Sequence, residues 1–287
     1  MTRRIAILAP DPDGEDAAGR WHMVFDKQAA PLRRAGLVVE ACPWTDDAAI
    51  GTFDLILPLL AWGYHKAGPR WAAATRDWEA RGLRVHNPPS VLRWNADKLY
   101  LGRLAAAGLP VAPVRFVERV TEAALEEAVQ AFDAGELIAK PQVSASAYRP
   151  IRWTPGAPLD GAPEGAAILQ PFLPAILDEG EISLLYFEGR FCHAIRKRPR
   201  TGDFRVQPEY QGIIDAHQPA PDERAAADAI LAALDEQDLL YARVDLVRGT
   251  AGAPLLMELE LVEPELYLEH DPGEGAAFTA AVVRAAA

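Results

Sequence analysis

Cysteine and long apolar stretches are scarce in this sequence. Only two cysteines occur among 287 residues, Cys42 and Cys192, and both lie in apolar surroundings. They predict buried free thiols instead of a disulfide framework, which is typical of a cytoplasmic protein. No run of about 18 uncharged apolar residues occurs, so no membrane span is expected.

An excess of positive charge and a metal-ligand spacing of histidines are also lacking. The 29 Lys and Arg residues are outnumbered by 41 Asp and Glu, and the formal net charge is −12. A general nucleic-acid binder or a protein of anionic membrane surfaces needs a positive field, so neither is expected. The six histidines do not follow the spacing of zinc ligands, and no zinc site is predicted.

The first 90 residues alternate between apolar strands and amphipathic helices. Strands are predicted at 5–8, 37–41, 55–60 and 83–86, and helices around 25–32 and 71–78, each helix followed by a glycine. This alternation predicts a parallel α/β lobe, so the start of the chain is interpreted as a first strand and not as a signal peptide.

The remaining residues predict lobes of the α+β type. We expect strands at 114–118, 137–141, 167–169, 182–187 and 190–195, and helices over 95–107, after Thr121, after Asp222 and at 278–287. The fold class is therefore α/β with α+β lobes.

The stretch 241–265 predicts two strands joined by a Gly/Pro turn. Pairing them can bring Asp245 beside Glu258 and Glu260, which lie two residues apart and therefore on one face. Three carboxylates on one face are unfavourable unless a cation neutralises them. An all-oxygen cluster suits Mg²⁺ or Mn²⁺ carrying nucleotide phosphates, and a solvated strand face is the alternative on this stretch alone.

Basic residues precede these carboxylates at three places. Lys98 begins a helix, Lys140 closes an apolar strand, and residues 196–198 form an Arg-Lys-Arg cluster. Each alone is typical of a solvated charge, except that Lys140 must reach from its apolar strand to a partner. Together with the carboxylates they indicate a triphosphate–metal site, in which lysines neutralise phosphates and an arginine meets the charge on the transferred phosphoryl group.

Seven short motifs follow one another along residues 87–265. They are NADKL around Lys98, LIAKP around Lys140, QPFLP at 170–174, EISLLYFEG at 181–189, RKRP at 196–199, RVDLV at 243–247 and MELEL at 257–261. In this order they make the sequence resemble the ATP-grasp superfamily of carboxylate–amine ligases. The resemblance implies an ATP-grasp fold, with a pre-ATP-grasp α/β domain at 1–90, subdomain A at 91–166 and subdomain B with the metal site at 167–287.

The resemblance also implies a role for each matching position. ATP would be bound by Lys98, Lys140, Ser144 and Ser146 at its phosphates, by Gln170, Pro171, Phe172 and Leu173 at the adenine, and by Glu181 at the ribose. The catalytic arginines would be Arg198 or its neighbour Arg196, together with Arg205 and Arg243. Two Mg²⁺ ions, or Mn²⁺ in their place, would be held by Asp245, Glu258 and Glu260.

Two positions depart from the pattern of the superfamily. The loop after Lys140, residues 142–149, is rich in serine and alanine where a glycine-rich phosphate loop is usual. Small side chains still permit a close approach of the backbone, but the conformational freedom of glycine is missing. Glu260 stands where many relatives have asparagine, and this third carboxylate changes the charge beside the reacting acyl group.

Within the superfamily, the segments SASAYR, HAIRKRP, GDFRVQPEY and MELELVEP resemble the branch that contains the cyclo-ligase of D-cycloserine biosynthesis. This implies ATP-dependent C–N ligation of a small amino-acid-like carboxylate through an acyl phosphate, with ring closure of O-ureido-D-serine as the type reaction. An intermolecular amino-acid or peptide ligase and a non-catalytic nucleotide-binding regulator are the alternatives. The substrate is expected near loops 11–19 and 62–66 with Tyr148, Arg149 and Glu265, and a homodimer is compatible with the resemblance.

Overall fold

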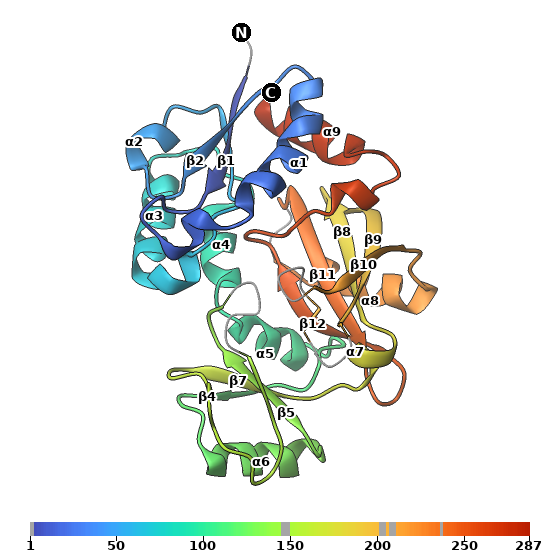
Figure 1. The fold of residues 1–287 in the computed structure, drawn as a ribbon. Helices are drawn as coiled ribbons and strands as arrows, with labels where there is room; N and C mark the ends of the chain where they lie inside the picture. Colours follow the sequence, from blue (N-terminus) through green and yellow to red (C-terminus); the bar gives the residue numbers. More distant parts are fainter. Residues whose placement is uncertain (1–2, 145–149, 201–204, 207–210, 236–237) are drawn as a thin grey trace.

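The computed structural model describes residues 3–144, 150–200, 205–206, 211–235 and 238–287, which form three sheets with their covering helices (Figure 1). The predicted site residues Ser146, Tyr148 and Arg149 lie outside the described residues. No helix within the described ranges is long and apolar enough to cross a lipid bilayer.

The first sheet is parallel and has the strand order β2-β1-β3. Its elements are β1 (Arg4–Ala9), η1 (Glu15–Ala18), α1 (Trp21–Arg34), β2 (Val38–Pro43), α2 (Asp47–Ile50), β3 (Leu55–Leu57), η2 (Tyr64–Ala67) and α3 (Gly68–Ala80). The glycine predicted to end the first helix, Gly36, follows α1 with a φ of +86°, a conformation that glycine adopts without strain. The strand predicted at 83–86 is reduced to a single parallel bridge between Ile56 and Val85.

The helix predicted over 95–107 begins later, as α5 (Leu99–Ala106), and a separate helix, α4 (Pro89–Asn95), precedes it. The chain turns between them because Asp97 accepts a hydrogen bond from the Leu99 backbone N–H at 2.9 Å. The Asn95 side chain donates to the Leu259 carbonyl and accepts from the Leu261 N–H, which holds the end of α4 against strand β12 (Pro254–Glu260).

The second sheet is antiparallel, with the order β4-β7-β5-β6. It consists of β4 (Arg115–Val117), β5 (Leu137–Pro141), β6 (Ile151–Trp153) and β7 (Ala167–Pro171), and helix α6 (Glu122–Phe132) lies beside it (Figure 1). Thr121 caps α6 as predicted, since its hydroxyl accepts from the Ala124 N–H at 3.2 Å. Strand β7 pairs with β4 and β5, so residues 167–171 belong to this sheet. The predicted boundary between subdomains A and B at residue 166 would separate β7 from these two strands. The division into three domains otherwise stays a prediction.

The third sheet is antiparallel, with the order β10-β9-β8-β11-β12. It consists of β8 (Glu181–Phe187), β9 (Arg190–Arg198), β10 (Ile213–His217), β11 (Tyr241–Arg248) and β12, with α7 (Ala175–Asp178) and α8 (Pro221–Ala232) beside it. Glu188 and Gly189 form the predicted hairpin turn between β8 and β9, both with positive φ. The residue predicted to cap α8, Asp222, lies in its first turn, and Ala220 is the N-cap because Glu223 accepts from the Ala220 N–H at 2.8 Å.

The first sheet and the third sheet share one hydrophobic core, which brings the two ends of the chain together. The core includes Ile5 and Phe25 from the first sheet and α1, Leu185 and Tyr241 from the third sheet, and Phe278 from α9 (Ala276–Ala286). Figure 1 shows α9 beside α1, above the third sheet. The short helix η4 (Leu268–His270) leads from the third sheet into α9. This shared core positions the loops of the first sheet at the edge of the third.

Candidate active site

A pocket lies where the first sheet, α4, α5 and the third sheet meet. Its lining includes ten charged side chains, four cations and six carboxylates: Arg20, Lys98, Lys197, Arg243, Glu181, Asp245, Glu258, Glu260, Glu263 and Glu265. The lining therefore carries two more carboxylates than cations. An excess of negative charge away from water favours the binding of a further cation.

Strand register gathers most of these charges on one face of the third sheet. Asp245 lies opposite Glu258 across β11 and β12, and Arg243 lies opposite Glu260. On the other side of β11, Asp245 lies opposite Ser183 of β8. Because side chains alternate between faces along each strand, residues two apart stay on the same face. The pairing predicted for Asp245, Glu258 and Glu260 is thus present.

Asp245 is the centre of this cluster. Its carboxylate accepts two hydrogen bonds of 3.0 Å from Arg243, one from Nε and one from Nη2, and one of 2.5 Å from the Ser183 hydroxyl. Burial by itself would raise the pKa of Asp245, but Arg243 and Lys197 outweigh it and lower the pKa to about 2. Asp245 is consequently a fully ionised acceptor that orients Arg243.

Lys197 is the buried cation of β9, with 2% of its surface exposed. Its ammonium pairs with Glu181, which lies directly opposite it on β8, and lies 3.4 Å from Asp245. Burial would lower the pKa of Lys197, but the two carboxylates raise it above its usual value. The Lys197 amine is therefore charged, and Glu181 and Asp245 hold it from two sides.

Lys98 joins α5 to the carboxylates of β12. Its ammonium lies 2.9 Å from Glu258 and donates a 2.8 Å hydrogen bond to the Ser144 carbonyl. Lys140, at the end of β5, is near enough for Glu258 to favour its charged form, yet burial dominates and lowers the pKa of Lys140. Lys98 therefore contacts both Glu258 and Ser144, and Lys140 lies near the same carboxylate without belonging to the pocket lining described above.

Glu260 and Glu263 are the carboxyl groups of the pocket whose ionised form is least stabilised before a ligand binds. Glu260 pairs with Arg243, but burial first, and then the charges of Asp245 and Glu258, raise its pKa to about 8. Burial also raises the pKa of Glu263 well above its usual value, and one of its oxygens, Oε2, is buried without a hydrogen-bond partner in the described part of the chain. Hard divalent cations prefer such oxygen donors, so these residues fit Mg²⁺.

The structure places Arg198 away from this pocket. Arg198 is exposed and pairs with Asp215 of β10 at 2.5 Å, because it lies on the face of β9 opposite to Lys197. The residue that β9 contributes to the pocket is Lys197, so the catalytic role predicted for Arg198 is not supported by this arrangement. Arg205 is also not part of the lining formed by the described residues.

The predicted adenine contacts lie at the end of β7. Gln170 is 1% exposed, and its amide oxygen and nitrogen have no hydrogen-bond partner among the residues that the structure describes. Phe172 and Leu173 are buried, and the Arg152 guanidinium lies 3.8 Å from the centre of the Phe172 ring. None of the four residues 170–173 contributes to the pocket lining described above.

Sequence reasoning gave no role to the pocket residues Arg20 and Glu263, or to Ser183, which donates to Asp245. It placed Lys197 in the basic cluster 196–198 but gave it no role of its own. Lys197 and Ser183 could have been found from the β8–β9 hairpin, whose turn at Glu188 and Gly189 sets Lys197 opposite Glu181. Arg20 carried no such signal, because its 2.7 Å contact with Glu265 joins segments far apart in sequence.

The loop around 62–66, predicted to approach the substrate, does line the pocket through Trp62 and Tyr64, and so does the predicted Glu265.

Comparison with known proteins agrees with this architecture. The family model for the N-terminal domain of D-cycloserine synthetase DcsG matches residues 5–87. The cycloserine biosynthesis protein DcsG of Streptomyces lavendulae is 30% identical over 257 residues, 82% of this chain and 85% of that protein. The crystal structure of D-cycloserine synthetase DcsG has a TM-score of 0.84 at 27% identity and covers 99% of this chain and 100% of that chain. D-alanine–D-alanine ligase from Bacillus anthracis shares the fold, with a TM-score of 0.71 at 15% identity over 99% of this chain and 97% of that chain.

The fold and the relatives define an ATP-grasp enzyme, which is an ATP-dependent ligase that forms carbon–nitrogen bonds. Enzymes of this class use ATP together with Mg²⁺. Within the class, the chain belongs to the family of D-cycloserine synthetase DcsG.

Proposed function

We propose that this enzyme activates a small amino-acid-like carboxylate with ATP and closes it into a ring, as in the conversion of O-ureido-D-serine to D-cycloserine. The observation that carries the proposal is the buried face of Lys197, Arg243, Asp245, Glu258 and Glu260 in a chain that is 30% identical to a cycloserine biosynthesis protein. Phosphoryl transfer needs positioned charges more than covalent help, and this face supplies them.

Four basic residues have proposed tasks, three from the pocket lining and Lys140 from nearby. Lys98, Lys140 and Lys197 bind phosphate oxygens of ATP, and Arg243 stabilises the charge that develops at the transferred phosphoryl group and the acyl carbon. The geometry supports this division, because Asp245 and Glu260 orient the Arg243 guanidinium while the Lys98 ammonium contacts Glu258. Arg205 remains a proposed contributor from outside this cluster.

The carboxylates Asp245, Glu258 and Glu260 are proposed to hold two Mg²⁺ ions, and Mn²⁺ would suit the same oxygens. The bound metal would supply charge neutralisation at the phosphates. Ser144 and Ser146 are proposed to approach the phosphates, Glu181 the ribose, and residues 170–173 the adenine. The buried, unpartnered amide of Gln170 supports an adenine contact, since a nucleobase edge offers both donors and acceptors.

In the proposed reaction, a carboxylate oxygen of the substrate attacks the γ-phosphorus, and ADP leaves. The acyl phosphate then accepts attack by the ureido nitrogen bonded to oxygen in the same molecule, which loses a proton as inorganic phosphate departs. To reach D-cycloserine, the carbamoyl group on that nitrogen must also leave, and one water molecule converts it to carbon dioxide and ammonia. Ring closure avoids the association entropy of a second substrate. Trp62, Tyr64 and Tyr267 beside the charged face are the proposed walls that exclude water from the acyl phosphate.

The test is ADP release from Mg-ATP with O-ureido-D-serine and with a panel of amino acids, each with and without hydroxylamine. Hydroxylamine converts an acyl phosphate into a hydroxamate. ADP release together with a cyclic product from O-ureido-D-serine is the expected outcome. ADP and hydroxamate only with amino acids other than O-ureido-D-serine would keep the ligase chemistry and contradict the proposed substrate. ATP binding without ADP release from O-ureido-D-serine would also contradict the proposed substrate.

The homodimer and the cytoplasmic location implied by the sequence stay predictions. Sedimentation of the purified chain measures the first, and fractionation of the producing cells measures the second.

A further inference from the structure

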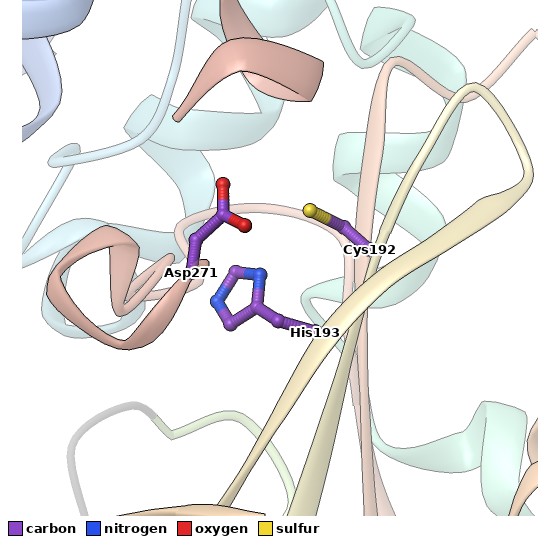
Figure 2. A group of neighbouring side chains, drawn as sticks. All are labelled: Cys192, His193 and Asp271. Carbon is purple, nitrogen blue, oxygen red and sulfur yellow. The ribbon is translucent and has the colours of Figure 1, made fainter. Parts of the chain in front are cut away.

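Three potential metal ligands meet at a second place, near the β8–β9 hairpin turn. They are Cys192 and His193 of β9 and Asp271, which directly follows η4. Each offers one ligand atom, and these atoms all lie within 4.8 Å of one another (Figure 2). None of the three lines the active-site pocket. The cluster is thus separate from the Mg-ATP site.

A bulge in β9 brings the two adjacent residues to the same side. Leu185 of β8 pairs with His193, whereas the next residue, Tyr186, pairs with Phe191, so Cys192 is the extra residue. In a regular strand, adjacent side chains point to opposite faces. A bulge changes this alternation and re-aims a side chain, which allows Cys192 and His193 to approach the same carboxylate.

His193 presents a nitrogen lone pair to this cluster. Its Nε2 lies 3.0 Å from the Leu266 carbonyl oxygen, and since a carbonyl only accepts, Nε2 carries the proton. With the proton on Nε2, Nδ1 is the ring nitrogen that can offer a lone pair to a metal. His193 is 4% exposed, and its Nδ1 has no hydrogen-bond partner in the described ranges. Figure 2 shows a ring nitrogen facing the space between Asp271 and the Cys192 sulfur.

Asp271 and Cys192 complete the donor set. The carboxylate of Asp271 is oriented by two backbone N–H groups, from Gly273 and from Gly275, each donating at 2.8 Å. Burial and the Asp271 charge raise the pKa of the Cys192 thiol to about 12, so the thiol is protonated and can donate to that carboxylate. Cys192 is half-buried, which leaves solvent access from its side.

We propose that Cys192, His193 and Asp271 form a Zn²⁺ site through Sγ, Nδ1 and one carboxylate oxygen, with water as the fourth ligand. One sulfur, one imidazole nitrogen and one oxygen suit Zn²⁺, whereas Mg²⁺ prefers oxygen alone. A zinc-bound histidine usually donates its other N–H to a carbonyl or carboxylate, as His193 does to Leu266.

Binding requires a small closure of the cluster. Ligand atoms around a tetrahedral zinc lie about 3.5 Å apart, so the widest separation here must shrink by about 1 Å. Rotation of the Cys192 side chain provides this movement, and its thiol proton passes to solvent as the Zn–S bond forms. Without the metal, the thiol–carboxylate contact satisfies two of the three groups and leaves His193 Nδ1 unpaired.

The site links β9 to the segment that leads from β12 to α9. Leu266 and Asp271, both of which contact His193 or its cluster, flank Tyr267, a pocket residue. A bound ion would therefore hold this segment against β9 and support the wall of the active site from behind.

The test uses the purified full-length chain after treatment with a chelator, in excess Mg²⁺ so that the carboxylates of the ATP site are occupied. Zn²⁺ is expected to bind with a stoichiometry of one per chain and to raise the melting temperature, and Co²⁺ should give a thiolate charge-transfer band. Cys192→Ser should abolish that band and weaken Zn²⁺ binding at least about 100-fold. Removing a residue that only hydrogen-bonds to a metal ligand already weakens binding by up to about 100-fold, and Cys192 is proposed to be a ligand itself.

Cys42→Ser is the matched control, because Cys42 is the other cysteine of the chain and lies in the first sheet. It should keep both the Co²⁺ band and the zinc affinity. Asp271→Asn provides a second variant in case Cys192→Ser fails to fold. Zinc binding that survives both Cys192→Ser and Asp271→Asn, or that is lost in Glu258→Gln instead, would overturn the proposal.

Discussion

The pKa values of two lysines on two different sheets are shifted in opposite directions. Lys197 of the third sheet is buried and contacts two carboxylates, which raise its pKa. Lys140 of the second sheet is only partly buried, but loss of hydration dominates there and lowers its pKa. The third sheet therefore holds the charge of Lys197 with its own carboxylates, whereas the second sheet carries polar groups that a ligand would complete. Gln170 of the second sheet is another such group, because its buried amide has no hydrogen-bond partner in the described chain.

The largest effect is expected for Lys197→Met. Removing the ammonium leaves Glu181 and Asp245 buried without this cation, and breaking a buried pair costs about 3–5 kcal/mol. Urea unfolding should show that loss, and ADP release should disappear.

Arg198→Ala is the matched control for this change. Arg198 neighbours Lys197 but pairs on the exposed face with Asp215, so about 0–1 kcal/mol should be lost. ADP release should be close to that of the unchanged enzyme. If Lys197→Met and Arg198→Ala lowered stability and ADP release equally, the distinction between the buried and the exposed face of β9 would be wrong. A selective loss of ADP release in Arg198→Ala would restore the catalytic role predicted from sequence.

Glu258→Gln should mainly affect turnover. Glu258 contacts Lys98 and faces Asp245, so the amide keeps the shape but removes a charge that the lysine and the proposed metal both need. If Glu258 is a metal ligand as proposed, its loss removes several kcal/mol of transition-state stabilisation, so Mg²⁺-dependent ADP release should fall at least about 100-fold. Measurement over a range of Mg²⁺ concentrations tests the assignment; full activity at ordinary Mg²⁺ would remove Glu258 from the metal site.

Lys140→Ala should have a smaller and different effect. A hydrogen bond to a charged group contributes about 1.5–3 kcal/mol, so calorimetry should show ATP binding weakened roughly 10- to 100-fold. The stability of the ligand-free protein should not fall, because burial already disfavours the charged lysine there. If nucleotide affinity is unchanged, or if the ligand-free variant loses as much stability as Lys197→Met, the contrast between the two sheets is wrong.

The smallest effect is expected for His65, whose ring nitrogens are buried outside both sheets. Burial, followed by the charge of Lys66, lowers the pKa of His65 to about 4. The unfolded chain then binds a proton below pH 6.5 that the folded chain does not, so His65 lowers stability as the pH falls from about 6.5 to about 4. The melting temperature of His65→Gln should therefore decline less over that interval than that of the unchanged protein. Parallel declines would show that His65 is protonated in the folded state.

Much of the local structure was predictable because it depends on neighbours in sequence. The Thr121 cap, the glycine after α1 and the Glu188–Gly189 turn all follow from backbone preferences of a few residues. The alternation in 241–262 was sufficient to predict that Asp245 lies near Glu258 and Glu260. The separate helix α4 and the later start of α5 were not predictable, since the end of α4 is held by contacts of Asn95 with Leu259 and Leu261.

The choice between Lys197 and Arg198 illustrates the limit of such reasoning. Period-2 alternation indicates that they lie on opposite faces of β9, but it does not say which face is buried. That depends on the pairing of β9 with β8, which sets Lys197 opposite Glu181, and on the pairing of β8 with β11, which brings Asp245 to the same face. The same holds for Cys192 and His193, whose joint approach to Asp271 depends on a bulge without a sequence signature of its own.

The sequence by itself determined the order of strands and helices, the spacing of the lysines and the carboxylates, and the class of chemistry that such a set can support. Only the tertiary structure decided which of these charges are buried together, because burial depends on register and on contacts between segments that lie far apart in the chain. Arg243 and Glu260 show why this matters: the distance between them, and the pKa that Glu260 acquires, exist only after β11 and β12 have paired and water has been excluded.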